Sequence, residues 1–161
     1  MSTFVEIVPC REEHVERALE ITYTAWTPIF DEYKRRLGEK AFNDLYGDRW
    51  DMKYSRVRNG LTSGRGYVAL ADGEVVGFIY YIVDEAKKKG LVEENAVCDK
   101  CRGMGIAQKM YEFVFKKMRE EGMVYAAVST GLDDSHAPAR RAYERAGFDR
   151  ELPNVLYYRE L

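Results

Sequence analysis

The sequence predicts a single α/β domain in which helices flank a mixed central β-sheet. Segments with strand and helix patterns alternate along the whole chain. The length of 161 residues fits one domain of ordinary size. Apolar residues make up 46% of the chain, which is enough for a packed interior and argues against wholesale disorder. No internal repeat, linker or low-complexity segment interrupts the pattern, so the domain is expected to cover residues 1–161.

The N-terminal half should contain one strand, two helical regions and a hairpin. Phe4–Val8 has strand composition and stops at Pro9. The next apolar residues recur at helical spacing, and Pro28 should end or redirect this first helix. A second helical region continues to Gly60. These segments predict a strand followed by two helices.

The clearest local signal is a β-hairpin. Tyr67–Ala71 and Glu74–Val83 both have strand composition, and only Asp72 and Gly73 separate them. An Asp-Gly pair favours the positive φ angles of a tight hairpin turn. We therefore expect two adjacent antiparallel strands here.

The C-terminal half should alternate strands and helices. Gly122 and Gly147 are placed to end two amphipathic helices. The expected elements are, in order, a strand at Leu91–Cys98, a helix from Ile106, a strand at Met123–Ser129, a helix at Ala139–Ala146 and a last strand at Val155–Tyr158. The whole chain then reads βααβββαβαβ.

Composition and charge exclude several classes of protein. The net charge is −2 and basic residues interleave with acidic ones, so the chain lacks the basic footprint of a nucleic-acid-binding protein. The longest apolar run, Val75–Val83, is about half of the ~20 residues that cross a bilayer. The N-terminus has neither the basic start nor the apolar core of a secretory signal. We expect a cytoplasmic protein that binds neither nucleic acid nor membrane.

The three cysteines predict neither a disulfide framework nor a metal site. Cys98 and Cys101 form one Cys-x-x-Cys pair, which occurs in redox proteins and in zinc sites. A zinc site needs further ligands, and only Cys10, His14 and His136 remain, scattered along the chain. We interpret the pair as ordinary cysteines at a strand end and expect no metal.

The segment Arg102–Ala107 is a candidate anion site between a strand and an amphipathic helix. The first N–H groups of a helix have no intrahelical partner, and Gly103 and Gly105 let a phosphate approach the backbone. A dinucleotide fingerprint fails because its third glycine is replaced by Gln108, and no Gly-Lys-Ser/Thr of a nucleotide triphosphate loop is present. A turn without a ligand remains the alternative.

Two motifs together point to a family. Arg102-x-x-Gly105-x-Ala107 follows a strand that ends in Ala and Val, and a second motif follows one strand later. The second motif consists of Ala139, Tyr143, Glu144, Ala146, Gly147 and Phe148. The two motifs together resemble the GCN5-related N-acetyltransferase (GNAT) family, most specifically between Glu93 and Phe148.

The resemblance implies a GNAT-like fold and acetyl-CoA as acyl-donor cosubstrate. The first segment would hold the pyrophosphate and the second helix would flank the cofactor. The cofactor-binding residues implied in this way are Ala96, Val97, Cys98, Arg102, Gly103, Met104, Gly105, Ile106, Ala107 and His136. His136 is a departure, because the family often has Asn at that position. An imidazole can still donate or accept a hydrogen bond there, or it is simply a polar residue near a helix start.

The resemblance also implies two catalytic residues. Tyr143 would donate a proton to the coenzyme A thiolate, with a core aromatic as the alternative. Glu93 would be the general base, acting directly or through water, and a solvated strand carboxylate is the alternative. Strand alternation should send Glu93 and Glu94 to opposite faces, so only one of them can face the cleft. A backbone N–H near Val97 would hold the oxyanion.

The acyl acceptor is predicted only by class. Trp26, Phe30 and Tyr33 fall in the region that usually shapes the acceptor site of the family, and they could equally be core residues. We expect an acetyltransferase that acts on a primary amine of a small molecule or of a peptide N-terminus. The alternative is a non-catalytic sensor that binds acyl-CoA, and a thiol redox protein is a weaker third interpretation. A homodimer is left open.

Overall fold

A five-stranded sheet organises the molecule in the order β1-β2-β3-β4-β5. The computed structural model describes residues 4–161, so the first three residues of the predicted domain lie outside it. All neighbouring strands are antiparallel except β4 and β5, which are parallel, and this makes the sheet mixed as predicted. The strands are β1 (Val5–Pro9), β2 (Gly66–Ala71), β3 (Glu74–Asp84), β4 (Lys89–Val97) and β5 (Tyr125–Val128).

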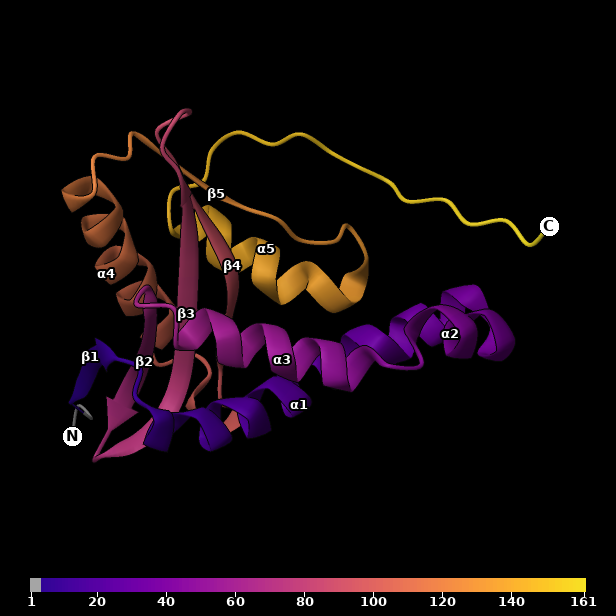
Figure 1. Ribbon diagram of the computed structural model, residues 1–161, viewed down its shortest axis with the longest axis horizontal. Helices are drawn as coiled ribbons and strands as arrows, with labels where there is room; N and C mark the ends of the chain where they lie inside the picture. The colour runs from indigo at the N-terminus through magenta and orange to yellow at the C-terminus, as the bar shows by residue number, and fades with distance from the viewer. Residues whose placement is uncertain (1–3) are drawn as a thin grey trace.

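Helices cover both faces of the sheet, each over its own hydrophobic core (Figure 1). One face packs against α1 and α3, and the other packs against α4, with α5 beside α4. In the part of the chain that the structure describes, no helix is long and apolar enough to span a membrane. The helices are α1 (Glu12–Leu37), α2 (Glu39–Tyr46), α3 (Arg49–Leu61), α4 (Ile106–Glu120) and α5 (Ala137–Arg145), with short 3-10 helices η1 (Asp99–Cys101) and η2 (Asp134–His136).

Pro28 does not end the first helix, because α1 continues through that residue to Leu37. Proline inside a helix costs about 3 kcal/mol, but Ile21 and Phe30 are buried on either side of it. Packing of both halves therefore outweighs the local penalty. The chain turns instead at Gly38, whose φ of 78° is readily adopted by glycine. The second helical region is also divided, so three helices lie between β1 and β2.

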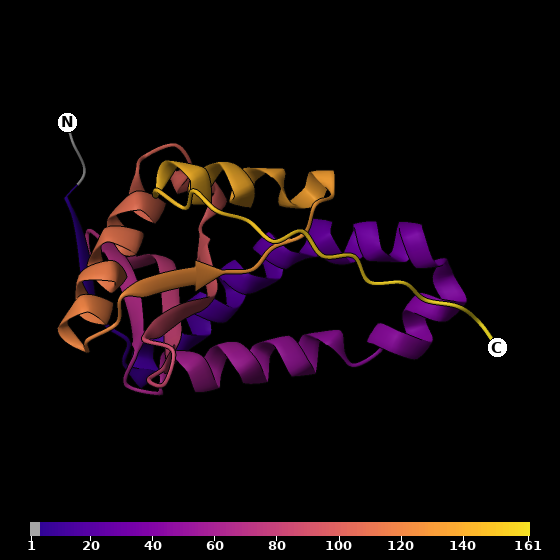
Figure 2. The same ribbon diagram turned by 90° about the horizontal axis from the view of Figure 1, so that it is seen from above.

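The predicted last strand at Val155–Tyr158 is also wrong. Residues 149–161 form neither helix nor strand and run from α5 towards α2, as both views show (Figures 1 and 2). Two contacts place this tail near α2: the hydroxyls of Tyr46 and Tyr158 are 3.0 Å apart, and Lys40 lies 3.9 Å from Glu160. A strand requires a neighbour, and sequence composition alone does not supply one.

A β-bulge in β4 changes which side chains face which helices. Tyr80 of β3 pairs with Glu94 and Tyr81 pairs with Val92, so Glu93 has no partner across the strands. Val92 packs on the α4 side, whereas Glu94 contacts Lys53 of α3. The bulge thereby directs the carboxylate of Glu94 to the opposite face from Val92, two residues away.

Candidate active site

The parallel strands β4 and β5 separate part-way along their length. Their pairing runs from Lys89–Tyr125 to Val92–Val128, whereas β4 continues to Val97. The N–H of Cys98 donates to the Val76 carbonyl of β3 at 2.8 Å. Because neighbouring residues of a strand direct their N–H groups to opposite sides, the N–H of Val97 points towards the edge that β5 has left. A polar backbone group therefore faces the gap between the two strands.

The N-terminus of α4 forms the second part of the site. Gly103 and Gly105 have φ angles of 78° and 75°, which glycine adopts without the penalty of a side chain. A Cβ built on either glycine would meet no atom within 4 Å, so the approach to the loop is open. The first turn of α4 begins at Ile106 and contains no acidic residue. Its free N–H groups and positive dipole end suit an anion.

A cleft of about 1030 Å³ joins this helix terminus to the gap between the strands and to α1 and α3. Most of the predicted site residues line it. They are Trp26, Tyr33, Glu93, Ala96, Val97, Arg102, Gly103, Gly105, Ile106, Ala107, His136 and Tyr143. Phe30 lines an adjoining pocket of about 320 Å³ instead.

Two predicted cofactor-binding residues lie outside the cleft lining. Cys98 packs against the core and gives its N–H to Val76, so this amide is not available to a ligand. Met104 lies at the tip of the loop and is 47% exposed. Cys98 directly follows β4, and pairing with β3 determines the side to which its N–H group points. The sequence alone does not reveal this pairing.

Tyr143 of α5 reaches the cleft from the side of α4. Its ring lies 5.9 Å from that of Tyr111, whose hydroxyl donates to Oδ1 of Asn95 at 2.7 Å. Burial raises the pKa of the Tyr143 phenol, and a hydrogen bond with Asn95 acts in the opposite direction. The phenol is therefore protonated at neutral pH and can act as a proton donor.

Both acidic residues of β4 line the cleft, so the prediction that only one of them can face it is wrong. Alternation fails because Glu93 is the bulge residue. Glu93 is half-buried, whereas Glu94 is only 5% exposed. The two carboxylates thus occupy the same cleft in different environments.

The carboxylate of Glu94 is held from α3. Its Oε1 accepts a hydrogen bond from Nζ of Lys53 at 2.8 Å, and Arg56 lies 3.6 Å away. Its Oε2 is buried and has no hydrogen-bond partner among residues 4–161. Burial raises the pKa of Glu94, although the positive charge of Lys53 opposes the rise. One oxygen of a weakened acid is therefore left free to accept a proton or a hydrogen bond.

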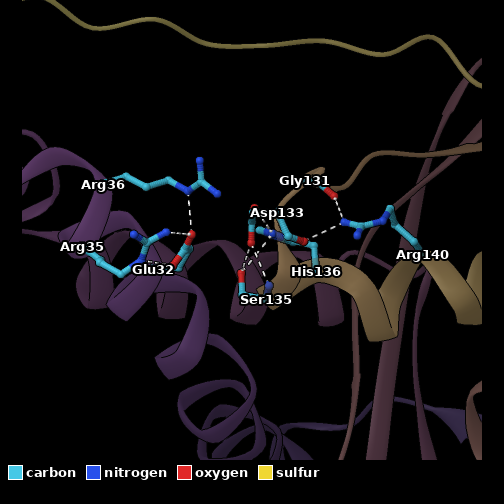
Figure 3. A network of polar contacts seen from close by, with 8 residues as sticks. All are labelled: Glu32, Arg35, Arg36, Gly131, Asp133, Ser135, His136 and Arg140. Carbon is cyan, nitrogen blue, oxygen red and sulfur yellow. Dashed lines mark hydrogen bonds and ion pairs between the residues drawn. The ribbon is translucent and has the colours of Figure 1, made fainter.

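A polar network at the start of α5 positions His136 (Figure 3). Asp133 accepts hydrogen bonds from Ser135 and lies 2.7 Å from Nδ1 of His136. Burial by itself would raise the pKa of Asp133, but these hydrogen bonds outweigh it and lower the pKa to about 2. Arg140 donates to the carbonyls of Gly131 and Asp133, both at 2.7 Å. The loop after β5 is thereby fixed, with one His136 nitrogen already engaged.

Sequence reasoning missed the residues that α3 contributes, and it missed Asn95 of β4. Arg49, Lys53 and Arg56 line the smaller pocket from one face of α3, and Lys53 and Arg56 also line the cleft. Asn95 lines the cleft beside Tyr111. The spacing of the three cations, i, i+4 and i+7, was a usable signal for a shared helix face. Nothing in the sequence alone pairs that face with Glu94.

The fold is a mixed α/β sheet in which the two parallel strands separate next to the N-terminus of a helix. Glycines flank that helix N-terminus, and this arrangement is suited to binding an anionic ligand. A family model described as the acetyltransferase (GNAT) family matches residues 23–148, most of the chain. The protein belongs to the GNAT acetyltransferase family. Comparison with curated protein sequences finds no match.

Solved structures share this fold at low sequence identity. PaiA N-acetyltransferase from Thermoplasma acidophilum in complex with coenzyme A has a TM-score of 0.73 and 15% identity, over 94% of this chain and 93% of that one. Aminoglycoside N-acetyltransferase AAC(6')-Iy in complex with CoA has a TM-score of 0.67 and 17% identity, over 99% and 97%. An aminoglycoside acetyltransferase from an uncultured soil metagenomic sample, in complex with sisomicin, has a TM-score of 0.59 and 18% identity, over 98% and 97%. These likenesses establish the GNAT fold for the whole described chain.

Proposed function

We propose that this protein transfers an acetyl group from acetyl-CoA to a primary amine of a small molecule or of a peptide N-terminus. The observation that carries the proposal is the continuous cleft that runs from the α4 N-terminus through the gap between β4 and β5 to the carboxylates of β4. A single cavity thus adjoins an anion site, an inward-facing backbone N–H, the half-buried Tyr143 and two carboxylates. This combination matches the requirements of acyl transfer to an amine.

The residues of the loop fit coenzyme A. The open approach to Gly103 and Gly105 leaves room for a pyrophosphate beside the free N–H groups of α4, and Arg102 adds positive charge at the rim. The two neighbours crystallised with coenzyme A support this assignment. When bound, acetyl-CoA supplies the thioester that is attacked. The N–H of Val97 is placed to donate a hydrogen bond to a carbonyl oxygen within the gap.

Proton transfer is assigned to the tyrosine and to the acidic residues of β4. Tyr143 donates a proton to the leaving thiolate, since its raised pKa keeps it protonated. For the general base, the resemblance implied Glu93, whereas the burial of Glu94 and its free Oε2 favour Glu94. A raised pKa brings a carboxylate closer to the strength that a base needs near pH 7. A water relay to Glu93 is the competing route.

A thiol-release assay with acetyl-CoA and a panel of amines and peptides tests the function. Thiol release that depends on an amine, with the acetylated amine identified by mass spectrometry, is the expected result. No turnover with any acceptor, combined with tight binding of acetyl-CoA, would show the alternative function, a sensor of acyl-CoA. Tyr143 in the cleft favours the enzyme, because a sensor has no need of a proton donor. The three cysteines are free, which supports the reducing cytoplasm as the proposed compartment.

The C-terminal tail and β5 support a homodimer as part of the proposal. Leu152 and Tyr157 are 97% and 86% exposed, which is unusual for apolar side chains within one segment. Strand β5 is an edge of the sheet, and Tyr125 on it is 60% exposed. An edge strand can pair with an extended segment of a second chain. We propose that the tail of one copy adds to β5 of another.

Light scattering of the purified full-length chain tests the dimer. We expect twice the monomer mass for wild type and a monomer when Leu156 and Tyr158 are replaced by proline, which prevents strand pairing. A monomeric wild-type protein at tens of micromolar would contradict the dimer and leave the enzymatic proposal intact.

A further inference from the structure

The pocket beside the cleft has a distinctive chemical lining. It lies between α1, α2 and α3 and has a volume of about 320 Å³. Trp26, Tyr33 and Lys53 are among the residues that line both this pocket and the main cleft, so the two cavities adjoin. Phe30 and Tyr46 add further aromatic wall. A molecule that reaches the carboxylates of β4 therefore has an aromatic-walled pocket next to it.

The charges along this pocket are mostly positive. Three cations of α3, Arg49, Lys53 and Arg56, line it, against one acid, Asp48. Spacing of i, i+4 and i+7 places the three on one face of the helix, and Arg49 lies about 6 Å along the helix axis from Lys53 at a rise of 1.5 Å per residue. Glu94 of β4 pairs with Lys53 and lies near Arg56, but it has no contact with Arg49. The cavity thus has an acid at one end and a separate cation at the other.

Arg49 has no acidic partner within 4 Å in residues 4–161. Its Nη1 donates to the carbonyl of Tyr46 at 3.1 Å, and its guanidinium lies 4.7 Å from the Phe42 ring and 5.9 Å from the Phe30 ring. Its Nε is buried without a hydrogen-bond partner among the described residues. Aromatic rings stabilise the cation but do not satisfy its N–H groups. A partly buried guanidinium with unused donors is suited to a carboxylate or a phosphate.

We propose that the acyl acceptor is an amine that also carries an anionic group, a carboxylate or a phosphate, which Arg49 binds while the amine reaches Glu94. This inference rests on the proposed function, because it names the substrate class of the same site. Lys53 and Arg56 reinforce the positive lining, and the aromatic walls accommodate an apolar portion of the acceptor. The same cations oppose a polycationic acceptor, such as a polyamine or an aminoglycoside, because like charges repel in a confined cavity.

Matched acceptor pairs test the inference. Each pair consists of an amine with an anionic group and the same amine without it: an amino acid against its amide, and phosphoethanolamine against ethanolamine. Spermidine and kanamycin serve as polycations. In a thiol-release assay with saturating acetyl-CoA, we expect the anionic member of at least one pair to have a kcat/KM at least tenfold higher than its partner. A preference for amino acids identifies the carboxylate, and a preference for phosphoethanolamine identifies the phosphate.

Variants of Arg49 separate binding of the anion from structural effects. Arg49→Met keeps most of the packing against Phe42, and it should raise KM for the anionic acceptor at least tenfold while the neutral partner changes less than twofold. Arg49→Lys should restore part of the preference. Arg58→Gln is the matched control, because it removes a cation from the same helix on the face that pairs with Glu12 and Glu16 of α1. It should leave the preference unchanged.

The outcomes of these experiments test the anionic acceptor separately from the proposed acetyltransferase function. Turnover that is best with kanamycin or spermidine, or an Arg49→Met defect that is equal for both members of a pair, overturns the anionic acceptor but not the acetyltransferase. If every amine is silent, the enzymatic function fails. Calorimetric titration of the coenzyme A complex with the same pairs then decides the pocket separately: tighter binding of the anionic member supports the Arg49 site, and equal or absent binding refutes it.

Discussion

The two ends of the cleft are built in different ways. At the proposed phosphate-binding end, the site consists of backbone: two glycines with positive φ and the first N–H groups of α4, all within Arg102–Gln108. At the proposed acceptor end, it consists of side chains from segments far apart in sequence, such as Trp26, Lys53 and Glu94. A site made of backbone depends only on the local sequence of the loop, so it is compatible with any acceptor. Substitutions on α1 and α3 can change the side chains of the acceptor end without altering the loop. Variants at each end should therefore have separable effects.

The largest effect is expected where the two ends meet, at Tyr143. Tyr143→Phe keeps the ring that packs beside Tyr111 and removes only the hydroxyl. If the phenol protonates the leaving thiolate, kcat should fall by roughly 10²–10⁴-fold, because the interaction is made only in the transition state. Acetyl-CoA affinity and thermal stability should stay close to wild type. Steady-state kinetics and calorimetry on the same preparation measure both, and wild-type turnover would reduce Tyr143 to a packing residue.

The next effect distinguishes the two carboxylates at the acceptor end. Glu94→Gln should lower kcat/KM by about 10²-fold at neutral pH, as expected for loss of a general base. Glu93→Gln should lower it less than tenfold, because Glu93 is half-buried at the bulge and is assigned no direct proton transfer. Acetyl-CoA affinity should be unchanged in both variants, since neither residue belongs to the loop. The reverse order of kcat/KM would assign the base to Glu93, as the family resemblance implied.

A smaller effect is expected at the phosphate end. Gly103→Val should raise the dissociation constant of acetyl-CoA at least tenfold, which corresponds to about 1.4 kcal/mol. A β-branched residue at a φ of 78° is strained, and its side chain enters the space that the pyrophosphate needs. Gly38→Val is the matched control, because Gly38 has the same φ and equally open surroundings outside the cleft. It should lose similar stability and bind acetyl-CoA normally, and equal binding by both variants would sink the loop assignment.

The same contrast explains what the sequence could predict. The loop, the hairpin and the helix that carries Tyr143 were predictable because each depends on a short local pattern. At the acceptor end, Trp26 and Tyr33 were predicted, but the pairing of Lys53 with Glu94 was not, because it depends on the path of α1 through Pro28 and on the bulge at Glu93. The rule that proline ends a helix accounts for the local free-energy cost of proline, but it does not account for the packing of α1 that outweighs this cost. The predicted strand at Val155–Tyr158 shows the converse, since strand composition cannot supply a neighbour.

The pH dependence of stability should report the burial of Glu94. Burial raises its pKa above the ordinary value of 4.5, so the folded protein holds this proton more tightly than the unfolded chain. The contribution to stability is fully present below pH 4.5 and is lost as the pH rises through the raised folded pKa. Across that window, wild type should lose free energy of unfolding relative to Glu94→Gln by at most about 1.4 kcal/mol per pH unit.

Urea denaturation of both proteins at a series of pH values between 4 and 8 measures this difference. Glu93→Gln is the control, and its difference from wild type should vary less with pH. A constant difference between wild type and Glu94→Gln over the whole range would mean that the pKa of Glu94 is the same in the folded and the unfolded chain, which contradicts the raised pKa.

The smallest effect is expected from the cysteine pair beside the proposed phosphate-binding end, where Cys101 lines the cleft and Cys98 does not. A hydrogen bond with Cys98 raises the pKa of Cys101 to about 11, and burial adds to the rise, so its thiol is neutral and unreactive at pH 7. Cys98 contributes a backbone N–H to β3, and serine retains that group. The double variant Cys98→Ser, Cys101→Ser should therefore lose no more than about 1 kcal/mol of stability and keep its turnover, and the same is expected of the control Cys10→Ser. Thermal denaturation, steady-state kinetics and metal analysis of the three proteins check this. If wild type contains bound zinc and the double variant lacks it and unfolds, the pair is a structural metal site instead, because such a site contributes folding energy directly.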